Sequence, residues 1–119
     1  MLSSVLIVDD DPAFRGLVHR IIVGLGLEVA GEADTFAGAL TAAAELQPEA
    51  ALVDVGLPDG DGTSLAAELT ALPWRPRVVL TSSDPDAVNA DRAEQVGAIG
   101  FLPKSDLTDG ALLRMLTGR

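Results

Sequence analysis

The segment Val5-Leu6-Ile7-Val8-Asp9-Asp10-Asp11-Pro12 carries the strongest fold signal in the sequence. Four consecutive apolar residues predict a short strand that is buried on both faces. The acidic run ends this stretch, and Asp11 before Pro12 is typical of a helix start, with a capping carboxylate followed by proline at the first helical position. A buried strand that leads so quickly into a helix indicates a parallel α/β sheet.

The same alternation of short apolar runs and helical spacing continues along the chain. Beyond residues 5–8, strands are predicted at 27–30, 50–53, 78–80 and 98–102. Helical spacing is clearest at 14–25, and further helices are predicted at 36–46, around 65–72, after Asp84-Pro85 and around 112–116. Thr35, Asp84 and Ser105 are candidate N-caps, and Gly24 is a candidate helix end. Five strands that alternate with five helices predict one parallel sheet with right-handed crossovers and helices on both faces.

Composition limits the class of protein. The chain has 119 residues, of which 48% are hydrophobic, so it is long enough for one domain with a buried core. We expect this domain to span residues 1–119, with no second domain in this chain. Because cysteine is absent, disulfides, thiolate metal sites and thiol nucleophiles are excluded. No apolar run approaches the roughly 20 residues of a membrane span, and no basic signal-peptide start is present. We therefore expect a cytoplasmic protein that does not associate with membranes.

The charge balance argues against nucleic-acid binding. Lys and Arg number 8 and Asp and Glu number 18, which gives a formal net charge of −10. Nucleic-acid binding needs basic groups that neutralise phosphates, so direct contact with DNA or RNA is not expected. The acidic excess is interpreted as solvated surface that can also steer basic partners.

Polar residues follow the predicted strands at their carboxyl ends, where open parallel sheets place their sites. Asp9 and Asp10 follow the first strand, Asp54 the third, Thr81 the fourth and Lys104 the fifth. Two carboxylates about 4 Å apart repel by about 4 kcal/mol at an effective dielectric constant of about 20, so the cluster needs a cation. Oxygen donors beside a phosphate suit Mg²⁺, and Lys104, the only lysine, supplies a compact ammonium for phosphate. Together these groups indicate phosphoryl transfer to an aspartate.

Four motifs, in this order and spacing, resemble the receiver domain of two-component response regulators over essentially the whole chain. They are Val8-Asp9-Asp10, Val53-Asp54-Val55-Gly56-Leu57-Pro58, Leu80-Thr81-Ser82 and Gly100-Phe101-Leu102-Pro103-Lys104. The resemblance implies a flavodoxin-like (βα)5 fold with strand order 2-1-3-4-5.

The same resemblance implies a role for each matching residue. Asp54 would accept a phosphoryl group from a phosphohistidine of a sensor kinase or phosphotransfer protein. The metal ligands would be Asp9, Asp10, Asp54 and the Gly56 carbonyl, with Mg²⁺ as the cofactor. Lys104 would pair with the phosphoryl group, Thr81 would move to bind it, and Phe101 would turn inward behind Thr81. The chain would then be no enzyme toward other substrates. It would act as a monomer or a phosphorylation-dependent dimer that switches its surface for a downstream protein.

Two departures and three alternatives accompany this interpretation. Ser105 follows Lys104 where the family commonly has a cis proline, and Gly56 offers no side chain to position a hydrolytic water. A phosphohydrolase of the haloacid-dehalogenase type would need an acid at position 56, and a calcium loop starting at Asp59 would need a glutamate where Thr70 stands. A receiver-like interaction module that is never phosphorylated stays open.

The one histidine, His19, lies off the core-facing stripe and is interpreted as solvent-facing.

Overall fold

A computed structural model describes residues 3–118, and residues 1–2 and 119 of the expected domain lie outside this range. The central sheet contains five parallel strands, which are β1 (Ser4–Val8), β2 (Glu28–Ala33), β3 (Ala50–Asp54), β6 (Arg77–Ser82) and β7 (Gly100–Pro103). Their order across the sheet is β2-β1-β3-β6-β7, which confirms the expected order 2-1-3-4-5. A small antiparallel hairpin, β4 (Gly56–Leu57) with β5 (Gly60–Asp61), follows β3.

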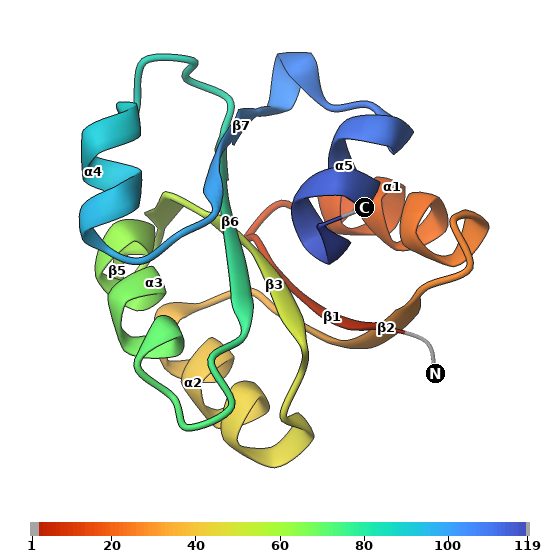
Figure 1. Cartoon of the computed structure of the whole chain (residues 1–119), viewed down its shortest axis with the longest axis horizontal. Helices are drawn as coiled ribbons and strands as arrows, with labels where there is room; N and C mark the ends of the chain where they lie inside the picture. Colours follow the sequence, from red (N-terminus) through yellow and green to blue (C-terminus); the bar gives the residue numbers. More distant parts are fainter. Residues whose placement is uncertain (1–2, 119) are drawn as a thin grey trace.

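Helices cover both faces of the sheet (Figure 1). One face carries α1 (Pro12–Gly24) and α5 (Asp109–Thr117). The other face carries α2 (Phe36–Leu46), α3 (Gly62–Thr70) and α4 (Ala90–Gln95). The flavodoxin-like (βα)5 sandwich is thereby confirmed.

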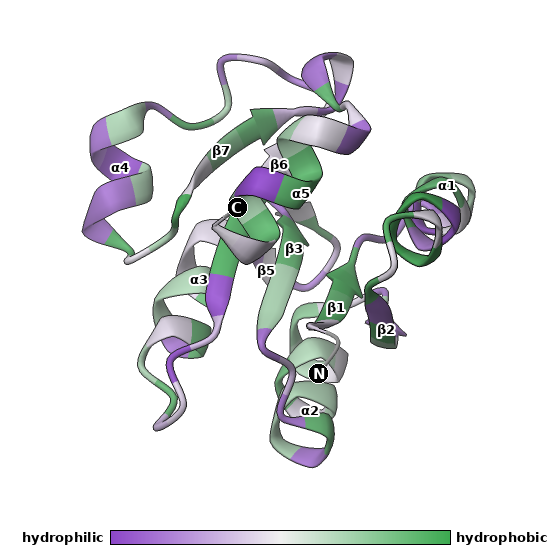
Figure 2. Ribbon diagram, turned by 45° about the vertical axis from the view of Figure 1, so that its right-hand side comes forward, coloured by the Kyte–Doolittle hydropathy of each residue, from purple (hydrophilic) through white to green (hydrophobic). Residues whose placement is uncertain are grey.

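The core is divided in two by the sheet. In β1, Leu6 and Val8 pack toward α2, α3 and α4, whereas Val5 and Ile7 pack toward α1 and α5. All four side chains are buried because side chains alternate between the faces of a strand and both faces are covered. Figure 2 shows strands β1, β3 and β7 as largely hydrophobic, whereas the edge strand β2 and much of α4 are hydrophilic. This rigid sheet fixes the positions at which the strands end.

Two predicted caps are confirmed. The Asp11 side chain accepts a hydrogen bond from the Ala13 N–H at 3.0 Å at the start of α1. Thr35 Oγ1 accepts from the Gly38 N–H at 2.9 Å at the start of α2. Gly24 is the last residue of α1, as predicted.

Two other predicted caps are wrong. Asp84 begins a turn, in which its carboxylate accepts the Asp86 N–H and its carbonyl accepts the Ala87 N–H. The fourth helix instead begins at Ala90, and Asn89 caps it. The Asp84 carboxylate, which was predicted to cap the helix, instead accepts a hydrogen bond within the turn. Turns and helix caps commonly compete for such side chains.

Ser105 likewise does not cap the last helix. It lies inside a short 3₁₀ helix, η1 (Lys104–Asp106), and Thr108 caps α5 by accepting the Ala111 N–H. No cis peptide bond occurs among residues 3–118.

Strand boundaries differ from the apolar runs that predicted them. The edge strand β2 continues to Ala33, past the polar Glu32, and β6 continues through Thr81 and Ser82. Backbone pairing extends these strands beyond their hydrophobic residues, which sequence hydropathy does not report. Within the described residues, the helices are too short or too polar to cross a membrane.

Candidate functional site

The predicted acidic residues meet at the carboxyl end of the sheet. Asp9 and Asp10 follow β1, and Asp54 ends the neighbouring strand β3. One carboxylate oxygen from each of the three lies within 4.8 Å of the others. Asp9 and Asp54 are buried, at 1% and 7% exposure, whereas Asp10 is exposed. The cluster therefore joins two buried carboxylates to one that faces solvent.

Lys104 brings the only ammonium side chain to this cluster. Its Nζ atom lies 2.8 Å from Asp9 Oδ2 and 4.0 Å from Asp54 Oδ2. It also lies 4.1 Å from the centre of the Phe14 ring, a cation–π contact. Sequence reasoning assigned Phe14 to the core stripe of α1 and missed this contact. One ammonium faces three carboxylates, so negative charge remains in excess.

Burial and the neighbouring charges change the proton affinity of Asp54. Burial, followed by repulsion from Asp9, raises the pKa of the Asp54 carboxyl above its ordinary value. Lys104 and the Gly56 N–H, which donates to Asp54 Oδ1 at 3.3 Å, oppose this rise without cancelling it. The ionised carboxylate of Asp54 is thus held at an energetic cost.

Two glycines shape the loop around Asp54. Gly56 is exposed, and its N–H donates a hydrogen bond to Asp54 Oδ1. Its role as a metal ligand through its carbonyl stays a prediction. A Cβ at Gly62 would lie 2.2 Å from the Asp54 carbonyl oxygen, so only glycine fits there. The Gly62 N–H donates to the Val55 carbonyl at 2.8 Å. Sequence reasoning did not single out Gly62, and its only signal was its place at the start of α3.

Thr81 faces the cluster from the next strand. It is fully buried and pairs in register with Asp54, and its Oγ1 atom has no hydrogen-bond partner. A buried hydroxyl without a partner is uncommon and calls for an explanation. Here it leaves an oxygen beside the Asp54 carboxylate free to bind another group.

Phe101 lies on β7, beside Leu80 in the sheet register. It is partly buried against the core under α4. It also lines an open pocket of about 380 Å³ between α4 and β7, together with Val88 and Ala93. The site therefore connects, through adjacent strands, to a ring that is neither fully packed nor fully exposed.

The donor set fits a hard divalent cation. Three carboxylates converge within 4.8 Å and carry more negative charge than Lys104 offsets. Oxygen donors with open solvent beside Asp10 suit Mg²⁺, which usually keeps several waters and takes few protein carboxylates. Asp9, Asp10 and Asp54 are the residues that would hold it.

Comparison with known proteins agrees with this geometry. Residues 5–116 match the family described as response regulator receiver domain. The chain belongs to this family. A receiver domain of this kind generally binds Mg²⁺ through an acidic pocket, here represented by the Asp9, Asp10 and Asp54 cluster.

Individual relatives support the assignment. The chain is 38% identical over 112 residues to a Pseudomonas aeruginosa protein described as a transcriptional regulator, covering 94% of this chain and 54% of that protein. It is 33% identical over 103 residues to the KDP operon transcriptional regulatory protein KdpE of Escherichia coli, covering 87% and 45%. The receiver therefore spans about half the length of the curated relatives it matches.

The receiver also superimposes on solved structures. The signal receiver domain of NarL from Mycobacterium tuberculosis matches with a TM-score of 0.84 and 36% sequence identity, covering 99% of this chain and 98% of that chain. The agreement extends over the whole sheet and all its helices, so the family assignment does not rest on the motifs alone.

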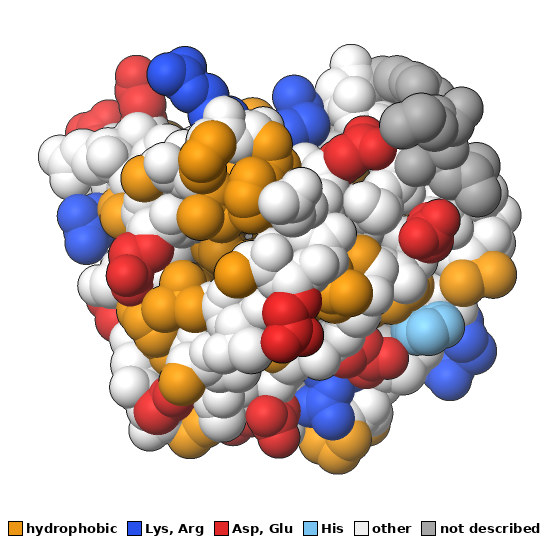
Figure 3. Space-filling model, turned by 90° about the horizontal axis from the view of Figure 1, so that it is seen from below, with side chains coloured by type: hydrophobic (Ala, Val, Ile, Leu, Met, Phe, Trp, Pro, Cys, Tyr) orange, Lys and Arg blue, Asp and Glu red, His pale blue; other side chains and the backbone are white. Residues whose placement is uncertain are grey.

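Residues outside the cluster follow the sequence-based interpretation in part. His19 is on the surface, with 46% of its side chain exposed, and its Nδ1 lies 3.1 Å from Glu32 Oε2. Acidic side chains are spread over the face seen in Figure 3, as expected for solvated surface. Arg15, which sequence reasoning did not consider, donates a hydrogen bond to the backbone carbonyl of Asp9.

Proposed function

We propose that the chain accepts a phosphoryl group on Asp54 from a phosphohistidine of a sensor kinase or a histidine phosphotransfer protein. The observation that carries the proposal is the convergence of three carboxylates with the single lysine at the carboxyl end of the sheet. An oxygen of Asp54 attacks phosphorus, a P–O bond forms as the P–N bond breaks, and the imidazole leaves with the bonding electrons. Bound Mg²⁺ would neutralise charge on the transferring phosphoryl oxygens.

The residues around Asp54 have separate roles in this proposal. Asp9, Asp10 and Asp54 would hold the metal, with the Gly56 carbonyl as a further ligand. Lys104, now paired with Asp9 at 2.8 Å, moves to the phosphoryl group once Asp54 is modified. The carboxylate-to-phosphoryl change adds negative charge next to this ammonium, which favours the new pairing.

Thr81 and Phe101 couple the phosphorylation of Asp54 to a change at the surface of the domain. The free Thr81 Oγ1 binds a phosphoryl oxygen, and Phe101 turns toward the space that Thr81 leaves. Because Phe101 also lines the pocket between α4 and β7, its movement changes the surface formed by α4, β7 and α5. A downstream protein then recognises the altered surface.

Other properties belong to the same proposal. The receiver catalyses only its own phosphorylation and dephosphorylation, acts in the cytoplasm, and is a monomer or a phosphorylation-dependent dimer. Its net charge of −10 argues against direct DNA contact by this domain. The regulatory output that the relatives' names describe would come through the binding surface of the domain.

The test is intact mass spectrometry after incubation with Mg²⁺ and a small-molecule phosphodonor. The parent protein should gain one phosphoryl group, and Asp54→Ala should gain none. Asp10→Ala should gain less than the parent at the same Mg²⁺ concentration, because one metal ligand is missing. Phosphorylation of Asp54→Ala at the parent level would place the acceptor elsewhere.

A negative result in the parent is resolved by beryllium fluoride, a stable phosphoryl mimic. Binding of the mimic, followed by NMR in the presence of Mg²⁺, would attribute the missing mass to rapid hydrolysis or poor donor use. Failure of both measurements would overturn the proposal in favour of an interaction module that is never phosphorylated.

A further inference from the structure

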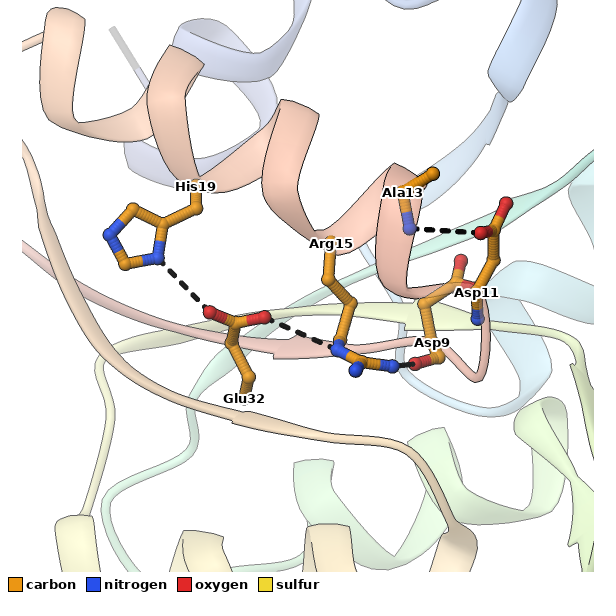
Figure 4. Close-up of polar contacts among 6 residues, drawn as sticks. All are labelled: Asp9, Asp11, Ala13, Arg15, His19 and Glu32. Atoms are coloured by element: carbon orange, nitrogen blue, oxygen red, sulfur yellow. Dashed lines mark hydrogen bonds and ion pairs between the residues drawn. The ribbon is translucent and has the colours of Figure 1, made fainter.

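Arg15 joins strand β2 to the loop that follows β1 (Figure 4). Its Nη1 atom donates a hydrogen bond to the backbone carbonyl of Asp9 at 2.6 Å. Its Nε atom donates to Glu32 Oε1 at 3.2 Å, and the second oxygen of Glu32 lies 3.1 Å from His19 Nδ1. The Arg15 side chain is only 20% exposed. A planar guanidinium thus bridges a backbone carbonyl and a carboxylate in fixed geometry.

The carbonyl that Arg15 binds belongs to the peptide group between Asp9 and Asp10. On the other side of Asp9, its N–H donates to the Ala33 carbonyl at 3.0 Å. The Asp9 side chain is held as well, since Oδ1 accepts the Asp11 N–H at 2.9 Å. Arg15 therefore completes the set of contacts that orient the peptide from which Asp10 projects.

We infer that Arg15 is a positioning residue for the divalent-cation site, with Glu32 holding Arg15 in place. This inference rests on the proposed Mg²⁺-dependent function. Arg15 fixes the Asp9–Asp10 peptide, so that the exposed Asp10 carboxylate is oriented toward Asp9 and Asp54 before the cation arrives. Without the bridge, the loop samples other orientations and Mg²⁺ binding has to restrict them.

The sign of the effect separates positioning from simple electrostatics. Arg15 is a cation, so its charge alone repels Mg²⁺, and its removal would tighten binding. Loss of positioning acts in the opposite direction. Partners that orient metal ligands typically change metal affinity by about 10- to 100-fold when mutated, and for this partly exposed bridge we expect Arg15→Gln to weaken Mg²⁺ binding about tenfold.

The experiment is an NMR titration of the folded protein with Mg²⁺ alone. Arg20→Gln is the matched control, because Arg20 is exposed on the same helix and carries the same charge. Asp10→Ala tests the underlying site. The proposed function requires that the parent protein binds Mg²⁺ and that Asp10→Ala does not. No Mg²⁺ binding by the parent would defeat that function, whatever Arg15 does.

Given binding by the parent, Arg15→Gln should bind Mg²⁺ more weakly and Arg20→Gln should bind equally or slightly more tightly. Equal or tighter binding by Arg15→Gln would overturn the inference. Arg15→Lys should remain impaired, because one ammonium cannot make both contacts in the guanidinium geometry, and full recovery by lysine would also overturn it. Circular dichroism and Trp74 emission confirm that each variant is folded.

Glu32→Gln tests the second half of the bridge. Removing this carboxylate weakens Mg²⁺ attraction through charge alone, so the single variant is not decisive. In the Arg15→Gln background, however, Glu32→Gln should cause a smaller further loss than in the parent if it acts through Arg15. Equal losses in the two backgrounds would remove Glu32 from the positioning role.

Discussion

The two halves of the site differ in whether their buried polar groups have partners within the protein. On the acidic side, formed by Asp9, Asp10, Asp54 and Lys104, the charged groups of Asp9 and Lys104 already have close partners within the protein. On the hydroxyl side, formed by Thr81 and Phe101, the buried Thr81 hydroxyl has no partner and Phe101 is only partly buried. Buried charges cost far more without partners than a neutral hydroxyl does. The difference suggests that the acidic side is organised in advance, whereas the hydroxyl side is free to rearrange.

The largest expected effect comes from removing the cation of the acidic side. Lys104→Met leaves the buried Asp9 and Asp54 carboxylates uncompensated, and we expect the free energy of unfolding in Mg²⁺-free buffer to fall by roughly 2–3 kcal/mol, below the full cost of breaking a buried pair because Lys104 is partly exposed. Urea denaturation followed by emission of Trp74, the single tryptophan, measures this change.

Two comparisons control the Lys104 result. Arg20→Met removes an exposed cation from α1 and should change stability by less than about 0.5 kcal/mol. Added Mg²⁺ should stabilise Lys104→Met more than the parent, because the metal replaces the missing positive charge. If both cation variants lose the same stability, the acidic side is not specially dependent on Lys104.

A smaller effect of opposite sign is expected at Asp54. Its pKa is raised in the folded state, so folding favours the protonated form; the stability contributed by this group is present below its ordinary value of 3.8 and is lost as the pH rises through the folded pKa. Asp54→Asn should therefore stabilise the protein at pH 7 by about 1 kcal/mol. This gain should vanish in acid. The measurement is the melting temperature between pH 3 and pH 8 without Mg²⁺.

Asp10→Asn provides the graded control for Asp54. Asp10 is exposed and is the weakest of the causes that act on the pKa of Asp54, so its gain should be smaller. A loss of stability in Asp54→Asn at neutral pH would mean that the folded protein does not hold this carboxylate at a cost.

The acidic side was largely predictable from the sequence, and its supporting contacts were not. Asp9, Asp54 and Lys104 could be placed because buried parallel strands must end at one edge of the sheet, and each residue follows such a strand. The contacts of Phe14 and Arg15 depend on how the first turns of α1 pack against that edge. Hydropathy places Phe14 in the apolar stripe of this helix and describes Arg15 only as a polar residue beside it.

Local competition explains the other failures of prediction. Asp84 had the sequence of a helix cap, yet its oxygens are used by a turn, and α4 starts at Ala90 with Asn89 as its cap. Gly62 was not singled out from the sequence, because its requirement for glycine is set by the Asp54 backbone eight positions earlier in the chain. Sequence patterns report what a residue can do, whereas tertiary packing decides which of several possible partners it takes.

Thr81→Val tests whether the buried hydroxyl of the hydroxyl side lacks a hydrogen-bond partner. The substitution replaces an unpartnered buried hydroxyl by a methyl group of similar shape, so the free energy of unfolding should rise by about 0.5–1 kcal/mol. Thr63→Val is the matched control, because the buried Thr63 Oγ1 donates to Asp61 Oδ2 at 2.8 Å, and this variant should lose stability. Urea denaturation compares the two. Destabilisation by both would show that Thr81 has a partner in solution.

The smallest expected effect lies just outside the site, at Asp59, and its pH dependence is opposite to that of Asp54. Hydrogen bonds from the Phe36 and Ala37 N–H groups, at 2.6 and 3.1 Å, lower the pKa of the exposed Asp59 carboxyl. The stability it contributes is present above the ordinary value of 3.8 and is lost as the pH falls through the folded pKa. Asp59→Asn should lower the melting temperature slightly at pH 7 and less in acid.

Glu45→Gln is the control for Asp59. It removes the same charge from α2, but near the C-terminal end, where the helix dipole disfavours an anion, so its melting temperature should be unchanged or slightly higher. If Asp59→Asn and Asp54→Asn shift the melting temperature in the same direction at pH 7, the contrast fails. Opposite shifts would show that carboxylates five positions apart affect stability in opposite ways, because Asp59 accepts backbone N–H groups that fix a helix, whereas burial and repulsion from Asp9 disfavour the ionised form of Asp54.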